Sequence, residues 1–218
     1  MIKNLLYQEW KLVALPVVYV FMSFFLMLLI PGYPYTVNFF YTCLALFMSV
    51  QTARENRDVL YMAMLPIAKK DIVKARYLFM LSAELLQILL CVPVALVRGT
   101  VLPYENPVGI EPNVAFFALA FLLFAAFNAV FLGSYFRDVH KVGTAFLKAT
   151  AAAFLVILAG EASVHVARAV SGACFWDSMR APDLLRQLPF LAVSLLAFAG
   201  VTALRYRADV RNFIAQDL

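Results

Sequence analysis

Long apolar stretches separated by short charged segments dominate the chain. A stretch of about 20 uncharged residues crosses a ~30 Å hydrocarbon core as a helix. The first uncharged run, Leu12 to Thr52, is about twice that length, but Pro31 and Pro34 interrupt it and predict a turn. The pattern predicts six spans: Leu12 to Ile30, Tyr35 to Ala53, Tyr77 to Val97, Val114 to Phe136, Ala149 to Ala167 and Pro189 to Leu204.

Composition indicates that lipid surrounds most of the chain. Of its 218 residues, 64% are hydrophobic and 14% are charged, and the mean hydropathy is +0.85. Soluble domains rarely reach these values. Because the spans do not alternate apolar and polar residues as barrel strands do, helices are the spanning element. We predict an all-α membrane protein with one transmembrane domain, residues 1–218.

The distribution of Lys and Arg predicts the orientation. With the N-terminus in the cytoplasm, 14 of the 18 Lys and Arg residues fall in cytoplasmic segments and four fall in outer ones. Short loops rich in these residues stay on the cytoplasmic side, so both ends are predicted to lie inside, in the inner membrane of a bacterium. Topology also accounts for the net charge of +5, so no nucleic-acid partner is expected.

Two segments are predicted to lie at the membrane surface. Residues 1–11 place Ile2, Leu5 and Trp10 on one helical face and polar residues on the other, which is typical of an interfacial helix. The alternative is an irregular start to the first span. Residues 168–188 mix aromatic and charged side chains, which favours a segment at the outer interface.

The segment between the second and third spans, residues 54–76, has more structure than a connection needs. Nine charged residues surround a short apolar core. Glu55 to Leu65 can form an amphipathic helix that Pro66 ends, and a basic helix can follow from Ile67 to Tyr77. We predict that this segment docks a soluble partner. The residues predicted to take part are Glu55, Arg57, Asp58, Val59, Leu60, Met64, Leu65, Pro66, Lys69 and Lys70.

The same segment resembles a known family. Arg54 to Asp58, Met64 to Ile67 and Lys70 to Arg76 are similar to the cytoplasmic loop of type 2 ATP-binding-cassette (ABC) exporter permeases. There an acidic residue precedes a Leu-Pro break, and an Ile-Val run then opens the third helix. The short chain and the stretch Gln51 to Asn56 most resemble small bacterial permeases related to exporters of phenol-soluble modulin peptides.

The resemblance implies a half-transporter. Two copies, or one copy and a paralogue, would form a pathway in the lipid and bind two separate ABC ATPase subunits. The exported substrate would be an amphipathic or hydrophobic molecule such as a peptide. The chain has no G-x-x-x-x-G-K-[ST] phosphate loop. ATP and Mg²⁺ are therefore expected on the partner ATPase, and neither a cofactor nor a catalytic residue is expected in this chain.

Polar residues inside the spans are candidates for a pathway or gate. An ionised side chain at mid-membrane costs at least about 2.5 to 3.5 kcal/mol, so it must face protein or water. The candidates are Glu84, Gln87, Asn128, Glu161 and His165. The same groups could instead be hydrogen-bond partners between helices. Both interpretations stay open.

Other function classes fit the sequence less well than the exporter. A metal-dependent hydrolase is disfavoured because His140 and His165 are predicted at opposite ends of the fifth span, too far apart for one zinc site. An ion-coupled secondary transporter or channel using the intramembrane acids is the main alternative. A membrane-embedded assembly factor is another.

Overall fold

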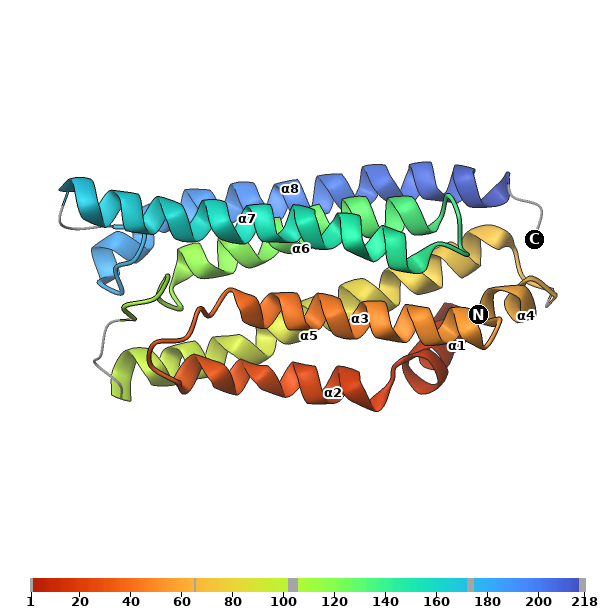
Figure 1. The fold of residues 1–218 in the computed structure, drawn as a ribbon, viewed down its shortest axis with the longest axis horizontal. Coiled ribbons are helices and arrows are strands. Elements are labelled where there is room, and N and C mark those ends of the chain that lie inside the picture. Colours follow the sequence, from red (N-terminus) through yellow and green to blue (C-terminus); the bar gives the residue numbers. More distant parts are fainter. Residues whose placement is uncertain (1, 65, 102–105, 172–174, 216–218) are drawn as a thin grey trace.

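The described part of the chain is built of helices. The computed structural model describes residues 2–64, 66–101, 106–171 and 175–215, without the side chains of residues 2–4, 12, 59, 63, 101 and 171. The all-α prediction is confirmed, because no strand occurs in these ranges. Most of the helices lie side by side as long rods (Figure 1).

The helices follow one another with short connections. They are α1 (Ile2–Gln8), the π-helix η1 (Glu9–Val13), α2 (Pro16–Met22), the 3-10 helix η2 (Ser23–Leu29), α3 (Val37–Glu55), α4 (Asp58–Met64), α5 (Lys69–Val101), α6 (Val114–Tyr135), α7 (Val142–Ser171) and α8 (Ala181–Ile214).

The N-terminal helix is set at an angle to the helix that follows it. Leu15 has extended backbone angles, as expected of a residue before proline, and Pro16 opens α2. The segments Leu5–Lys11 and Pro16–Leu29 are bent by 83° relative to each other. The first apolar rod therefore begins at Pro16, later than the predicted Leu12, and its interfacial start stays a prediction.

Several helices are longer than the spans predicted from uncharged stretches. α5 begins at Lys69 and includes most of the basic helix that was predicted separately from Ile67 to Tyr77. α8 extends beyond the predicted Pro189 to Leu204 at both ends. Lys and Arg are good helix formers. A charged residue therefore ends the apolar stretch that can lie in lipid, but the helix continues beyond that residue.

Four described helices, α5 to α8, are long and apolar enough to cross a membrane. The number is five if the bent segments Leu5–Lys11 and Pro16–Leu29 form one span. α3 is not among them, since polar residues such as Asn38 and Gln51 lower its hydropathy. It nevertheless packs against α2 and α7. The sixth span therefore stays a prediction.

α6 is the buried centre of the bundle. In its most apolar segment 61% of residues are buried, against 17% in that of α8. α6 packs against α7 and α8, and the Phe39 ring of α3 lies 4.8 Å from the Phe116 ring of α6, centroid to centroid. The outer faces of α7 and α8 expose side chains such as Leu155 and Leu196, as helices surrounded by lipid do.

The two ends of the bundle contain different segments (Figure 1). One end, called the α4 end, holds α1, α4, the α6–α7 turn and the end of α8. The opposite end holds the turn before α3, residues 106–113 and residues 175–180, and is called the outer end after its predicted orientation.

A test of the packing uses the contact between α6 and α8. A Cβ atom added to Gly133 would overlap the Arg205 guanidinium, which is held by Asp209. Gly133→Ala is expected to lower the free energy of unfolding by about 1 to 3 kcal/mol, as overpacking does. The measurement is the thermal unfolding of the purified protein in detergent.

The matched control is Gly200→Ala in α8, because nothing lies within 4 Å of the added Cβ. Alanine favours a helix over glycine by up to about 1 kcal/mol, so the control is expected to be neutral or slightly stabilising. Equal melting temperatures for the two variants would contradict the close approach of Arg205 to α6.

Candidate coupling site and polar clusters

The segment predicted to dock a partner forms a separate short helix at the α4 end. α3 ends at Glu55, and Arg57 has a φ of 54°, a left-handed conformation that ends a helix. α4 then runs from Asp58 to Met64. The predicted helix from Glu55 is therefore interrupted at Arg57. The carboxylate of Asp58 lies in the first turn of α4, where the helix dipole favours negative charge.

α4 exposes large apolar side chains. The exposed fractions are 42% for Leu60, 60% for Tyr61 and 72% for Met64, whereas Met62 is 6% exposed. Leu60 and Met64 belong to the predicted docking face. Tyr61 was not among the predicted docking residues, although its position between Leu60 and Met64 on a short helix indicates that it belongs to the same face.

The other predicted docking residues surround α4. Glu55 accepts a hydrogen bond from Gln51, and Arg57, Pro66 and Lys70 are exposed. Lys69 donates to the carbonyl oxygen of Ile214 over 3.4 Å, which links the start of α5 to the end of α8. Leu65 lies outside the described residues, as does the side chain of Val59.

A buried ion cluster lies behind α4. The Arg76 side chain is buried, and its Nη1 atom lies 3.1 Å from Glu9 Oε2 while its Nη2 atom lies 2.8 Å from Asp58 Oδ2. One arginine thus joins η1, α4 and α5. Sequence reasoning predicted Asp58 for the docking face, but it missed Glu9 and Arg76, since nothing in the sequence pairs residues 67 positions apart.

A second cluster at the α4 end joins α5 to α8. Tyr77 donates a 2.5 Å hydrogen bond to Asp209, and Arg205 lies 2.9 Å from the same carboxylate. Asp209 is fully buried. The two clusters connect the N-terminal part of α5 to η1 and α4 through Arg76 and to α8 through Tyr77.

Three of the predicted pathway residues pair with neighbouring helices. Asn128 of α6 donates to the Glu84 carboxylate of α5 over 2.8 Å. Gln87 donates to Asn38 of α3 over 3.0 Å. All four side chains are buried. These are hydrogen bonds between helices, and a pathway role for the three residues stays a prediction.

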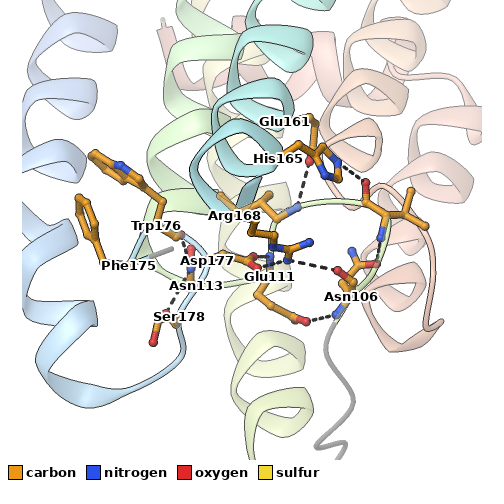
Figure 2. A network of polar contacts seen from close by, with 12 residues as sticks. Asn106, Glu111, Asn113, Glu161, His165, Arg168, Phe175, Trp176, Asp177 and Ser178 are labelled. Atoms are coloured by element: carbon orange, nitrogen blue, oxygen red, sulfur yellow. Dashed lines mark hydrogen bonds and ion pairs between the residues drawn. The ribbon is translucent and has the colours of Figure 1, made fainter. Parts of the chain in front are cut away.

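The other two predicted pathway residues hold the backbone of residues 106–113 (Figure 2). Glu161 accepts from the amide of Ile110 at 2.9 Å and from the hydroxyl of Thr36 at 2.6 Å. A His165 ring nitrogen lies 3.1 Å from the carbonyl oxygen of Val108. Both side chains therefore bind the backbone of residues 106–113, and their role in a pathway stays a prediction.

Two ion pairs complete the network at the outer end. Arg98 of α5 lies 3.2 Å from the Glu111 carboxylate, donates to the carbonyl of Leu28 and covers the Tyr35 ring at 4.8 Å. Arg168 of α7 pairs with Asp177, as Figure 2 shows. The network ties residues 106–113 to α5 and α7.

The described residues of the predicted outer segment, 168–171 and 175–188, pack on residues 106–113. Asp177 accepts from the Glu111 amide at 2.8 Å, and Asn113 donates to the Trp176 carbonyl at 2.6 Å (Figure 2). Gln187 donates to the carbonyl of Phe175. This segment is therefore a bound cap on the bundle. Its position at the membrane interface stays a prediction.

Comparison with known proteins decides the family. A family model described as "ABC-2 family transporter protein" matches residues 1–172. The chain belongs to the ABC-2 transporter family. No curated protein and no solved structure gave a match.

Membership of the ABC-2 family has three consequences. The chain is a membrane transport component with a permease role, it is a multi-pass membrane protein, and its family implies partnership with an ABC ATPase. The resemblance that rested on residues 54–76 is thus confirmed for the family. The narrower relation to phenol-soluble modulin exporters stays a prediction.

The network at the outer end generates a stability prediction. Glu111→Gln breaks the ion pair with Arg98, whose side chain is 2% exposed. Removing one partner of a buried ion pair costs about 3 to 5 kcal/mol. We expect a correspondingly lower free energy of unfolding, measured by chemical denaturation of the purified protein in detergent.

Asp183→Asn is the control, because its partner Arg186 is 71% exposed. Breaking an exposed pair costs at most about 1 kcal/mol. Similar losses in both variants would show that the Arg98–Glu111 pair does not hold the outer end together.

Proposed function

We propose that this ABC-2 family chain is the permease subunit of an ABC exporter and that α4 is its coupling helix. The observation that carries the proposal is the exposed face of Leu60, Tyr61 and Met64 on α4. Charged residues flank that face on both sides, at Arg54 to Arg57 and at Lys69 to Lys70. Apolar side chains so placed gain stability when a soluble partner covers them.

The partner that fits this face is an ABC ATPase. Two ATPase subunits would bind two copies of the permease, or one copy and a paralogue, and would hold ATP and Mg²⁺. α4 connects α3 directly to α5, so a displacement of α4 reaches two transmembrane helices. ATP binding would draw the ATPases together, and the permease would respond with a rigid-body movement.

The proposed topology has six spans with both chain ends in the cytoplasm of a bacterium. Five spans come from α5 to α8 and the rod that begins at Pro16. α3 supplies the sixth, because its 19 residues pack along α2 and α7. The excess of Lys and Arg then lies at the α4 end, as the positive-inside rule requires.

The proposed substrate is an amphipathic or hydrophobic molecule such as a peptide. This part of the proposal rests on the resemblance to small bacterial peptide exporters. Substrate and pathway lie between two permease copies in this scheme, within the lipid bilayer.

Docking through α4 is tested by co-purification. The chain is co-expressed with an ABC ATPase encoded beside it and purified on a tag that the permease carries. Leu60→Asp places a charge in the exposed face, which a partner would have to desolvate. We expect the ATPase to co-elute with the wild type, and we expect the variant to lose at least about 90% of it, a tenfold change that corresponds to 1.4 kcal/mol.

Ile214→Asp is the matched control, since Ile214 is also exposed at the α4 end but lies on α8. Its complex is expected to match the wild type. Loss of the ATPase in both variants would move the docking surface away from α4. Failure of any ATPase to co-elute with the wild type would reject the exporter and favour an ion-coupled carrier.

Topology is tested with reporter fusions. Green fluorescent protein joined after Leu218 is expected to fluoresce, because the C-terminus lies in the cytoplasm. Alkaline phosphatase joined after Pro112 is expected to be active, because that position lies outside. An active phosphatase joined after Ala68 would contradict the cytoplasmic position of α4.

A further inference from the structure

The buried ion cluster of Glu9, Arg76 and Asp58 joins η1, α5 and α4. We propose that Arg76 is a positioning residue that makes the N-terminal segment, α1 with η1, move together with α4 and α5 when the ATPase changes state. This inference rests on the proposed coupling role of α4. It adds the N-terminal segment to the coupling device and names the side chain that attaches it.

Burial makes the cluster a firm connection. Arg76 is 1% exposed and Glu9 is 2% exposed. Arg76 Nη1 lies 3.1 Å from Glu9 Oε2 without a hydrogen bond, and Arg76 Nη2 donates a 2.8 Å hydrogen bond to Asp58 Oδ2. Separating buried charges costs several kcal/mol, because neither group regains water. A movement of α4 that keeps the cluster intact must therefore carry Glu9 with it.

The N-terminal segment has a second attachment to α5 just beyond the cluster. The Trp10 indole donates a 3.0 Å hydrogen bond to Ser82, and its ring packs edge-on against Phe79 at 5.2 Å. Contacts at Arg76, Phe79 and Ser82 lie along one face of α5, at helical spacing. The segment is thus fixed to α5 over about two turns.

The composition of the cluster allows its connection to the N-terminal segment to be weakened while the connection between α4 and α5 is kept. One guanidinium faces two carboxylates, so Glu9→Gln leaves the Arg76–Asp58 pair balanced. The variant weakens the connection to the N-terminal segment and preserves the connection between α4 and α5. The matched control is Asp138→Asn, which neutralises a carboxylate in the α6–α7 turn at the same end of the bundle, where its partner Lys141 is 72% exposed.

The experiment measures the distance between α1 and the connection from α4 to α5. Spin labels are attached at Tyr7→Cys and Ala68→Cys, both exposed positions outside the proposed docking face, after Cys43, Cys91 and Cys174 are replaced by alanine. Electron-spin distance distributions are recorded for the complex with the ATPase, with and without trapped ATP. We expect the otherwise unchanged protein to give one narrow distribution that ATP does not shift.

The Glu9→Gln variant is expected to give a broader distribution that shifts when ATP is trapped, whereas Asp138→Asn is expected to behave like the protein with Glu9. A merely stabilising role for Glu9 would not produce a response to ATP. An ATP-dependent shift already present with Glu9, or no change on Glu9→Gln, would overturn the proposal. If Glu9→Gln does not fold, Glu9→Asp keeps the charge, withdraws it from Arg76 and must give the same ATP-dependent shift.

Failure of this inference can be told apart from failure of the proposed function. Co-elution of the ATPase is measured in the same preparations and reports docking alone. If the ATPase binds but the labels contradict the expected pattern, only the role of Arg76 is rejected. If no ATPase binds, the exporter and this inference are both rejected.

Discussion

Hydrocarbon offers no hydrogen bonds, so polar groups placed among apolar helices depend on partners within the protein. The described chain meets this constraint by gathering its polar side chains into groups. One lies at the α4 end around Arg76 and Asp209, one at mid-bundle around Glu84, and one at the outer end around Arg98 and Glu161. The apolar packing around α6 fills the space between them.

α5 takes part in all three groups. Arg76, Glu84 and Arg98 all lie on this single helix of 33 residues, which at 1.5 Å per residue is about 50 Å long. Its two ends are therefore each anchored by a buried arginine. A short helix joined to a rod of this kind has a direct mechanical route across the membrane, which is the property that a coupling helix needs.

Sequence reasoning was strongest where the constraint acts on neighbouring residues. Apolar stretches of membrane length, the turn at Pro31 and the structured loop around Asp58 are all local patterns, and residues 54–76 pointed to the family that the comparison confirmed. Helix ends were less predictable. The predicted spans stop next to the charges of Arg76 and Arg205, but the hydrogen-bonded backbone continues through both residues.

The long-range ion pairs could not be predicted from the sequence. Glu9 and Arg76 are far apart in the chain, and each alone is typical of an exposed residue near the membrane surface. Only the bend before Pro16, together with the start of α5 at Lys69, brings them into contact. Glu161 and His165 lie four residues apart on α7, a spacing that allows them to pair with each other, but both bind residues 106–113 instead.

The two connections of α4 differ in a way that bears on coupling. Towards α3, the link passes through Arg57 in a left-handed conformation, a single point at which the chain direction changes. Towards α5, the covalent link is supported by the buried Asp58–Arg76 pair. A force applied to the exposed face of α4 therefore acts on a turn towards α3 and on an ion-paired helix towards α5. Within the proposed exporter, α5 rather than α3 is the helix that carries the movement of the ATPase towards the outer end.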